Sequence, residues 1–240
     1  MIETVRLGLN CSNQSCGKTI IDPRRKPTRC DSVSITPIPP KARSFGFVPD
    51  LRRCEAGDLI LSHSILPGFA EKLIVRAQIH AGLSADDSRW THAAVFLYQD
   101  FVLEAVPWKG VITRSLYSDI PDNILRVRRR RNLDDEEEQE HRIKGYKIAL
   151  CAQRMLGTRY GVSAALSLGW RSIFRGDLWN RDWLPLFRSA VICSQVVYDA
   201  HAQITRDLLD RCPINGGVMP AHLSATSDLE DVSIPWVKVA

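Results

Sequence analysis

Short runs of apolar residues, several of them alternating with polar ones, recur between residues 57 and 130 and predict a series of β-strands. The predicted strands are "GDLILSH" (57–63), "THAAVFLY" (91–98), "FVLEAV" (101–106), "GVITRSL" (110–116) and "ILRVRRR" (124–130). A tight turn at Gln99 and Asp100 joins the second strand to the third. Strands that follow one another this closely are typical of an antiparallel sheet.

Apolar positions spaced for helices lie between and after these strands. The predicted helices are 67–83, 132–157, 161–169, a segment that starts at Cys193, and "MPAHLSAT", with Pro220 at its start. For the longest helix, Asn132 or Asp134 is the expected N-cap, acidic residues fill the first turns, and Gly157 ends the helix. The pattern therefore predicts an α+β fold in which helices pack on an antiparallel sheet.

The first part of the chain has little periodicity and several prolines, and it ends in "SITPIPPKARSFGFVPD". We therefore predict that residues 1–49 form an N-terminal arm or small appendage packed against a main domain at 50–240. A chain of 240 residues is long enough to bury one sizeable core.

The charge and hydropathy of the chain exclude some classes of protein. A net charge of +5 is modest, so we predict no nucleic-acid partner. The basic run at 126–131 stands just before acidic residues at 134–138, and we interpret it as a solvated strand end beside a helix start; the alternative is a regulatory or membrane-surface patch. No apolar run of membrane-spanning length and no signal peptide is visible, which predicts a soluble protein, cytoplasmic by default or exported by a non-standard route.

The seven cysteines are scattered and odd in number, which favours free thiols in a reducing compartment. Cys11, Cys16 and Cys30 are spaced like part of a zinc ribbon, but the fourth ligand would have to be the distant Cys54. We therefore predict no metal and interpret this segment as a loosely ordered arm, with zinc binding as the alternative.

One cysteine stands where chemistry would use it. In "VICSQVVYDAHAQI" (191–204), Cys193 lies at the joint between an apolar run and a predicted helix. A thiol with an ordinary pKa of about 8.5 is mostly protonated at neutral pH, and the free amides and positive dipole end of a helix start favour the thiolate. The same amides could bind an oxyanion. The alternative is that Cys193 is a small hydrophobic core residue.

A thiolate nucleophile needs a histidine base and a group that orients it. His92 opens a predicted strand, and Glu104 is an isolated carboxylate in the neighbouring apolar strand, where a charge needs a partner. A two-residue turn would place Glu104 opposite Val95, on the face away from His92. The pairing therefore predicts a bulge or similar irregularity between Phe96 and Leu103.

The ordered set "GDLIL", "THAAVFL", "VLEAVPWKGV", "LGTRYG", "ICSQVVYDA" and "MPAHL" resembles the circularly permuted papain-like cysteine hydrolases, in the YiiX-like branch related to the NlpC cell-wall peptidases. The resemblance spans about residues 55–225. It implies a permuted papain-like fold with Cys193 as nucleophile, His92 as base, Glu104 as the residue that orients the base, and no cofactor. It also implies that Tyr160 lies near the cleft.

Other residues leave alternatives open. Trp90 and Trp108 flank the hairpin of the proposed base, either as walls of a substrate groove or as core and rim aromatics. His63 is interpreted as structural rather than as a cleft residue. Ser194 lacks the G-x-S-x-G elbow of a serine hydrolase.

Taken with the resemblance, these residues predict a cysteine hydrolase, an amidase or endopeptidase of bacterial cell-wall peptides. An exported antibacterial effector is compatible with this, with a secretion apparatus or an immunity protein as partner. The alternatives are a thioesterase or acyltransferase of lipid or acyl-ester substrates, and a non-catalytic binding module of the same fold.

Overall fold

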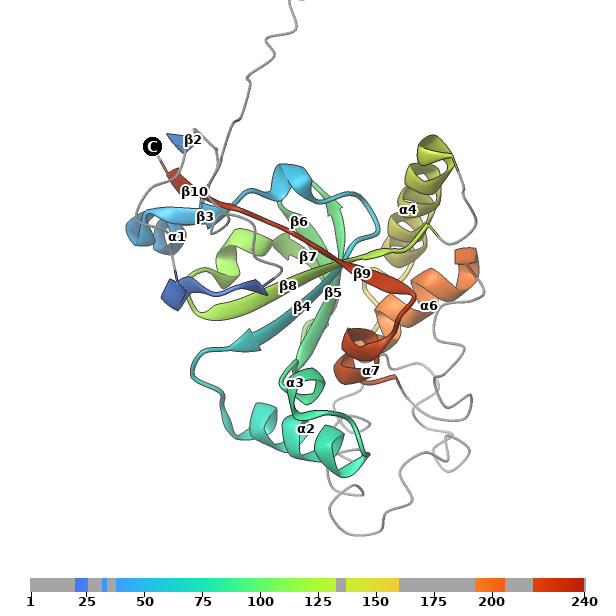
Figure 1. The fold of residues 1–240 in the computed structure, drawn as a ribbon, viewed down its shortest axis with the longest axis horizontal. Helices are drawn as coiled ribbons and strands as arrows, with labels where there is room; N and C mark the ends of the chain where they lie inside the picture. Colours follow the sequence, from blue (N-terminus) through green and yellow to red (C-terminus); the bar gives the residue numbers. More distant parts are fainter. Residues whose placement is uncertain are drawn as a thin grey trace, which may run out of the picture.

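A seven-stranded sheet lies at the centre of the molecule (Figure 1). The computed structural model describes residues 20–25, 32–33, 38–132, 137–159, 193–205 and 218–239. The strands of the sheet are β1 (Ile20–Ile21), β8 (Asn123–Arg130), β4 (Leu59–Ser64), β5 (His92–Tyr98), β6 (Phe101–Val106) and β7 (Gly110–Ser115) in spatial order, with β9 (Leu229–Val232) also paired to β8. Every neighbouring pair is antiparallel, as predicted.

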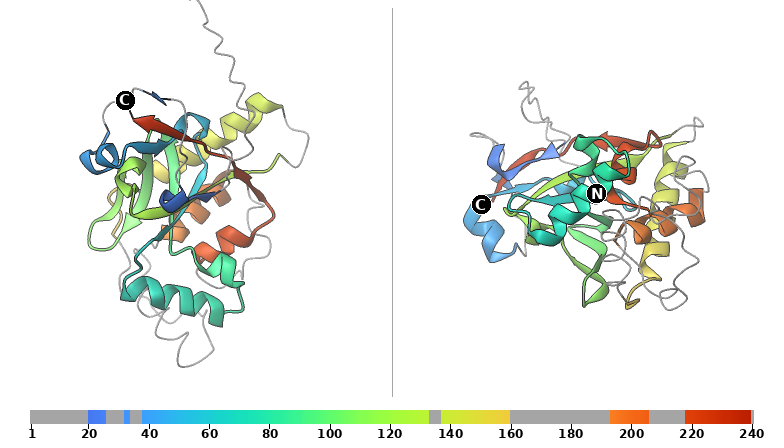
Figure 2. Two further views of the ribbon diagram at one scale, coloured as in Figure 1. Left: turned by 60° about the vertical axis from the view of Figure 1, so that its left-hand side comes forward. Right: turned by 90° about the horizontal axis from the view of Figure 1, so that it is seen from below.

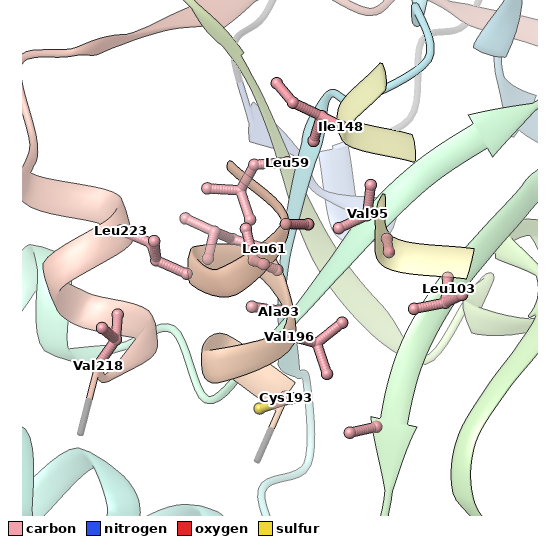
Figure 3. Close-up of a cluster of buried hydrophobic side chains, with 14 of the residues drawn as sticks. Leu59, Leu61, Ala93, Val95, Leu103, Ile148, Cys193, Val196, Val218 and Leu223 are labelled. Carbon is pink, nitrogen blue, oxygen red and sulfur yellow. The ribbon is translucent and has the colours of Figure 1, made fainter. Parts of the chain in front are cut away.

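Helices cover one face of this sheet. They are α4 (Glu138–Gln153), α6 (Cys193–Thr205) and α7 (Pro220–Ala225), and Figure 2 shows them on the same side of the sheet in two further views. Their apolar side chains meet those of β4, β5 and β6 in a first core, which includes Leu61, Val95, Ile148, Val196 and Leu223 (Figure 3). Between β4 and β5 the chain forms α2 (Phe69–His80) and α3 (Ala85–Ser88). These elements confirm the α+β class.

The opposite face carries a second core and a small three-stranded sheet. That sheet has the order β2 (Ser32–Val33), β10 (Trp236–Val239), β3 (Phe47–Pro49), and it is accompanied by α1 (Pro40–Phe45) and the short 3₁₀ turns η1 (Pro23–Arg25), η2 (Leu51–Arg53) and η3 (Leu116–Asp119). Ile21, Ala42 and Val48 are buried here against residues of β5 and β8. The described parts of residues 20–49 thus share a core and sheet pairings with the rest of the chain. The division into an arm or small appendage at 1–49 and a main domain at 50–240 stays a prediction.

The observed helices are shorter than the predicted ones, for local reasons. The segment 67–83 ends at His80, and Gly82, with a φ of 83°, lies in the turn before α3. The prediction that α4 begins at Asn132 or Asp134 is wrong, because β8 continues to Arg130, which pairs with β9, and the helix begins only at Glu138. The predicted helix at 161–169 lies outside the described residues.

The basic run of β8 is not a solvated strand end. Arg128 is only 6% exposed and donates to the carbonyl oxygens of Ser224 and Thr226, at the end of α7, at 2.7 and 3.0 Å. Arg129 holds Asp58 through two hydrogen bonds of 2.8 and 2.9 Å. These guanidinium groups therefore join α7 and the segment before β4 to the sheet, and a helix end buried in this way needs such donors.

Two further expectations concern the membrane and the arm cysteines. Within the described ranges, no helix combines the length and the apolar character needed to span a bilayer. The described residues also contain no group of three side chains suited to hold a metal ion. Cys11, Cys16 and Cys30 lie outside these residues, so the zinc alternative for the arm stays a prediction.

Candidate active site

An irregularity in the hairpin of β5 and β6 brings His92 and Glu104 to the same face of the sheet. Glu104 pairs with Ala94, while beside the turn the register shifts between Phe96 and Tyr98. Side chains two residues apart on a strand share a face, so Glu104 points to the side of Ala94 and His92. The predicted bulge is thereby confirmed, and the two side chains meet: His92 Nε2 and Glu104 Oε2 are 2.6 Å apart.

Cys193 is the first residue of α6 and is 7% exposed. Figure 3 shows its sulfur at the end of that helix, with Ala93 of β5 nearby. The neighbouring Ser194 is fully buried, and its hydroxyl donates a hydrogen bond to the carbonyl oxygen of Val218. Ser194 therefore anchors the start of the helix, and its hydroxyl is engaged, so the thiol of Cys193 is the candidate nucleophile at this joint.

Cys193 and His92 shift each other's proton affinity. Burial would raise the pKa of the Cys193 thiol, but the charge and hydrogen bond of His92, with the backbone amides of Ala93 and Ser194, bring that pKa below its ordinary value. Burial would likewise lower the pKa of His92, yet the thiolate and Glu104 raise it well above its ordinary value. Since His92 Nε2 is engaged by Glu104, Nδ1 is the nitrogen left for the sulfur. The pair is thus suited to exist as thiolate and imidazolium.

Glu104 is a buried carboxylate held by two cations. It is 2% exposed, which by itself would raise its pKa, but hydrogen bonds and charges from His92 and Arg114 lower that pKa to about 2. Arg114 donates from Nε to Oε1 and from Nη2 to Oε2, the latter at 3.0 Å. The carboxylate consequently stays ionised at neutral pH and can orient the ring of His92.

The start of α6 also supplies donors for negative charge. The N–H groups of the first helical turn, including that of Cys193, have no partner within the helix. The backbone amides of Ser194 and Ala93 hydrogen-bond to the Cys193 thiol. Free amides at this helix start could stabilise the charge that develops on a carbonyl oxygen under attack. The described residues thus contain a candidate nucleophile, a candidate base, a group that can orient the base, and amides that could bind an oxyanion.

The three residues predicted to bind a substrate, Trp90, Trp108 and Tyr160, differ in where the structure places them. The expectation that Trp90 lines a groove is wrong for this side chain, because it is 1% exposed in the first core and its carbonyl oxygen accepts a hydrogen bond from Gln78. Trp108 is 87% exposed in the turn between β6 and β7, with a φ of 67°. That turn follows the end of β6 that lies beside His92, so the assignment of Trp108 as a substrate contact stays a prediction. Tyr160 lies outside the described residues.

Arg114 is a residue of the candidate site that the sequence pattern does not predict. Ile112 of β7 pairs with Glu104, so Arg114, two residues further on, shares its face of the sheet. The motif "GVITRSL" was predicted as a strand, and an arginine in a strand beside an isolated glutamate was the available signal. That signal becomes specific only with the register between β6 and β7, because the register decides whether the two side chains share a face.

No family model and no curated protein matches the chain. Among solved structures the chain is similar to the crystal structure of the metalloprotein YiiX from Escherichia coli O157:H7, with 19% sequence identity and a TM-score of 0.46. The match covers 73% of this chain and 94% of that chain. A likeness of this degree does not indicate which chemistry the site performs.

Proposed function

We propose that the protein is a cysteine hydrolase that cleaves an amide bond, with a permuted papain-like arrangement of its catalytic residues. The observation that carries the proposal is the chain of contacts from the buried Cys193 through the partly buried His92 to the buried Glu104, with the thiol at the first residue of a helix. The histidine precedes the cysteine in the sequence, which is the order implied by the resemblance to permuted enzymes.

The proposed reaction has two halves. The Cys193 thiolate adds to the substrate carbonyl carbon, the carbonyl oxygen takes the negative charge, and amides at the start of α6 bind it. The imidazolium of His92 gives its proton to the leaving nitrogen as the C–N bond breaks, which leaves a thioester on Cys193. Neutral His92 then takes a proton from water, whose oxygen attacks the thioester, and loss of the acid regenerates the thiolate.

Cell-wall stem peptides are the substrate class we propose, on the basis of the resemblance. An exposed tryptophan, Trp108, stands at the end of the sheet that holds His92 and could contact such a chain. This substrate would place the protein outside the cytoplasm, so export, a secretion apparatus and an immunity protein stay predictions that follow from it.

The test is digestion of purified peptidoglycan sacculi, with the released fragments identified by mass spectrometry. We expect the wild-type protein to release peptide fragments and the Cys193→Ala variant to release none. Equal traces from both proteins would contradict the cell-wall substrate.

A second candidate, an acyl-ester or thioester hydrolase, is favoured by exposed apolar side chains near the same end of the sheet. Leu66 and Phe69 are 87% and 79% exposed, and they follow β4 just beyond Ser62, the residue that pairs with His92. These side chains could bind an acyl chain. This candidate is selected if the wild-type protein hydrolyses a long-chain p-nitrophenyl ester, the Cys193→Ala variant does not, and neither protein releases fragments from sacculi. If the protein is inactive on both substrates and the Cys193 thiol is unreactive, the result supports the alternative of a non-catalytic binding module.

A further inference from the structure

We infer that Arg114 is a positioning residue of the proposed active site: its guanidinium holds Glu104 as an oriented carboxylate, and through Glu104 it maintains the His92 and Cys193 ion pair. The inference deepens the proposed function and rests on it. It gives a role to a residue that touches neither the thiol nor the base.

The contact between Arg114 and Glu104 is bidentate. Nε donates to Oε1, and Nη2 donates to Oε2 at 3.0 Å. The same Oε2 meets His92 Nε2 at 2.6 Å. With both oxygens fixed by one planar group, the carboxylate cannot rotate away from the imidazole ring, and a planar fork suits this task better than a point charge.

Arg114 is itself immobilised by groups outside the site. Its Nη1 and Nη2 atoms lie 2.9 and 3.0 Å from the two carboxylate oxygens of Asp119 in η3. Nη1 also donates to Ser118 Oγ at 2.8 Å and to the carbonyl oxygen of Ser115 at 3.3 Å. Each nitrogen of the guanidinium therefore has partners within the protein, so Arg114 acts through Glu104 and does not bind a substrate.

The burial of Glu104 explains why a second cation is needed. At 2% exposure the carboxylate has lost most of its hydration, which favours the protonated form. The charged groups that act on it are His92 and Arg114, and those that act on Arg114 are Glu104 and Asp119. Without Arg114, Glu104 would depend on His92 alone and would compete with it for a proton. A neutral Glu104 would no longer favour the imidazolium, and the thiolate would lose its partner.

A matched control exists in the same sheet. Arg129 on β8 holds Asp58 with two hydrogen bonds of 2.8 and 2.9 Å, and Asp58 is also 2% exposed. Arg129→Gln therefore removes the same kind of fork from an equally buried carboxylate that contacts no histidine in the described residues.

The experiment measures the pH profile of Cys193 alkylation by iodoacetamide in wild type, Arg114→Gln, Arg114→Lys and Arg129→Gln, with folding checked by circular dichroism. We expect Arg114→Gln to move the midpoint upward by at least about one pH unit, so that alkylation at pH 6 is about tenfold slower. Lysine can engage one carboxylate oxygen, so Arg114→Lys should give a smaller upward shift. Arg129→Gln should keep the wild-type midpoint.

A folded Arg114→Gln with the wild-type midpoint would overturn the inference, as would an equal shift in Arg129→Gln. If Arg114→Gln does not fold, a wild-type midpoint in Arg114→Lys overturns it instead. Alkylation needs no substrate, so failure to find a cleaved bond leaves this test intact. A wild-type thiol that reacts only near its ordinary pKa would overturn both the inference and the proposed ion pair.

Discussion

Glu104 in β6 and Asp58 just before β4 are two carboxylates in nearly the same surroundings, yet their pKa values are shifted in opposite directions. Each is 2% exposed, and each accepts hydrogen bonds on both carboxylate oxygens from one arginine, which is Arg114 for Glu104 and Arg129 for Asp58. The pKa of Glu104 is lowered to about 2, with burial offset by His92 and Arg114. The pKa of Asp58 is raised, because burial there outweighs Arg129.

The pKa values of the two carboxylates differ because Glu104 has a second cationic neighbour, His92, in addition to its arginine. Asp58 has Arg129 and the amide of Glu55, whose N–H donates to it at 2.8 Å, and it serves to close the turn before β4. Glu104 has Arg114 and also His92, which in turn contacts Cys193. A buried carboxylate with an arginine is therefore a structural feature in one place and part of a candidate site in the other, and the histidine distinguishes them.

The largest expected effect comes from removing the charge of Glu104, with removal of the Asp58 charge as the comparison. Glu104→Gln keeps the shape of the side chain but no longer favours the imidazolium, so we expect the rate of acyl transfer to fall by about a thousandfold. Asp58→Asn should leave that rate unchanged in the folded protein. Hydrolysis assays on the substrate that requires Cys193 provide the measurement. Similar losses in both variants would break the comparison.

The pH dependence of stability should separate the two carboxylates by sign. A folded pKa near 2 against an ordinary value of 4.5 means that Glu104 contributes about 3 kcal/mol above pH 4.5, lost as the pH falls from 4.5 toward 2. Asp58, with a raised pKa, contributes in the opposite sense, because its stabilisation is present at low pH and lost as the pH rises through the folded pKa.

Urea unfolding of wild type, Glu104→Gln and Asp58→Asn between pH 2.5 and 6 tests this. Glu104→Gln should flatten the acid-side loss of stability, whereas Asp58→Asn should steepen it. The same slope in all three proteins would contradict the assignment of opposite shifts.

A smaller effect is expected from the glycine next to Asp58. Gly57 has a φ of +88°, and a Cβ there would lie 2.5 Å from the carbonyl oxygen of Gly145 in α4. Gly57→Ala should therefore destabilise the protein by about 2 kcal/mol through the contact and the left-handed backbone. The turn is hydrogen-bonded to β5 at Phe96, four residues from His92. The alkylation profile of Cys193 in the folded variant should therefore match wild type. A shifted profile would show that the two regions are coupled.

The smallest effect is expected at Trp108, which is 87% exposed beside the site. Trp108→Ala should raise KM by about threefold to tenfold with little change in kcat, because it removes a contact made equally in the ground state and the transition state. Thermal denaturation should be unchanged. A KM equal to that of wild type would contradict the prediction that Trp108 contacts the substrate.

How much could be predicted from the sequence depended on whether local pattern or long-range pairing decides a feature. The strand at 101–106 was predicted with its observed bounds, because alternation and the turn at Gln99 and Asp100 are local. The bulge could be predicted because two charged side chains had to meet across one hairpin. The role of Arg114 needed the register of a further strand, which no local signal determines.

The errors have the same cause. The place of Trp90 before a strand left a groove wall and a core position open, and the choice of the groove is wrong because the side chain is 1% exposed in the first core. Arg128 looked solvated in a run of arginines, but its strand is flanked by β4 and β9, and α7 presents carbonyl oxygens to it. The sequence pattern also does not say how the described residues between 20 and 49 pack, because they pair with β8 and β10, which are far away in the sequence.

The central claim, that Cys193 is a thiolate because His92 is its partner, is tested most directly by limited alkylation with iodoacetamide near pH 6 followed by peptide mapping. Of the seven cysteines, Cys193 should carry nearly all the label, and the His92→Ala variant should lose it. Slow and even labelling of all seven, unchanged by His92→Ala, would contradict the account.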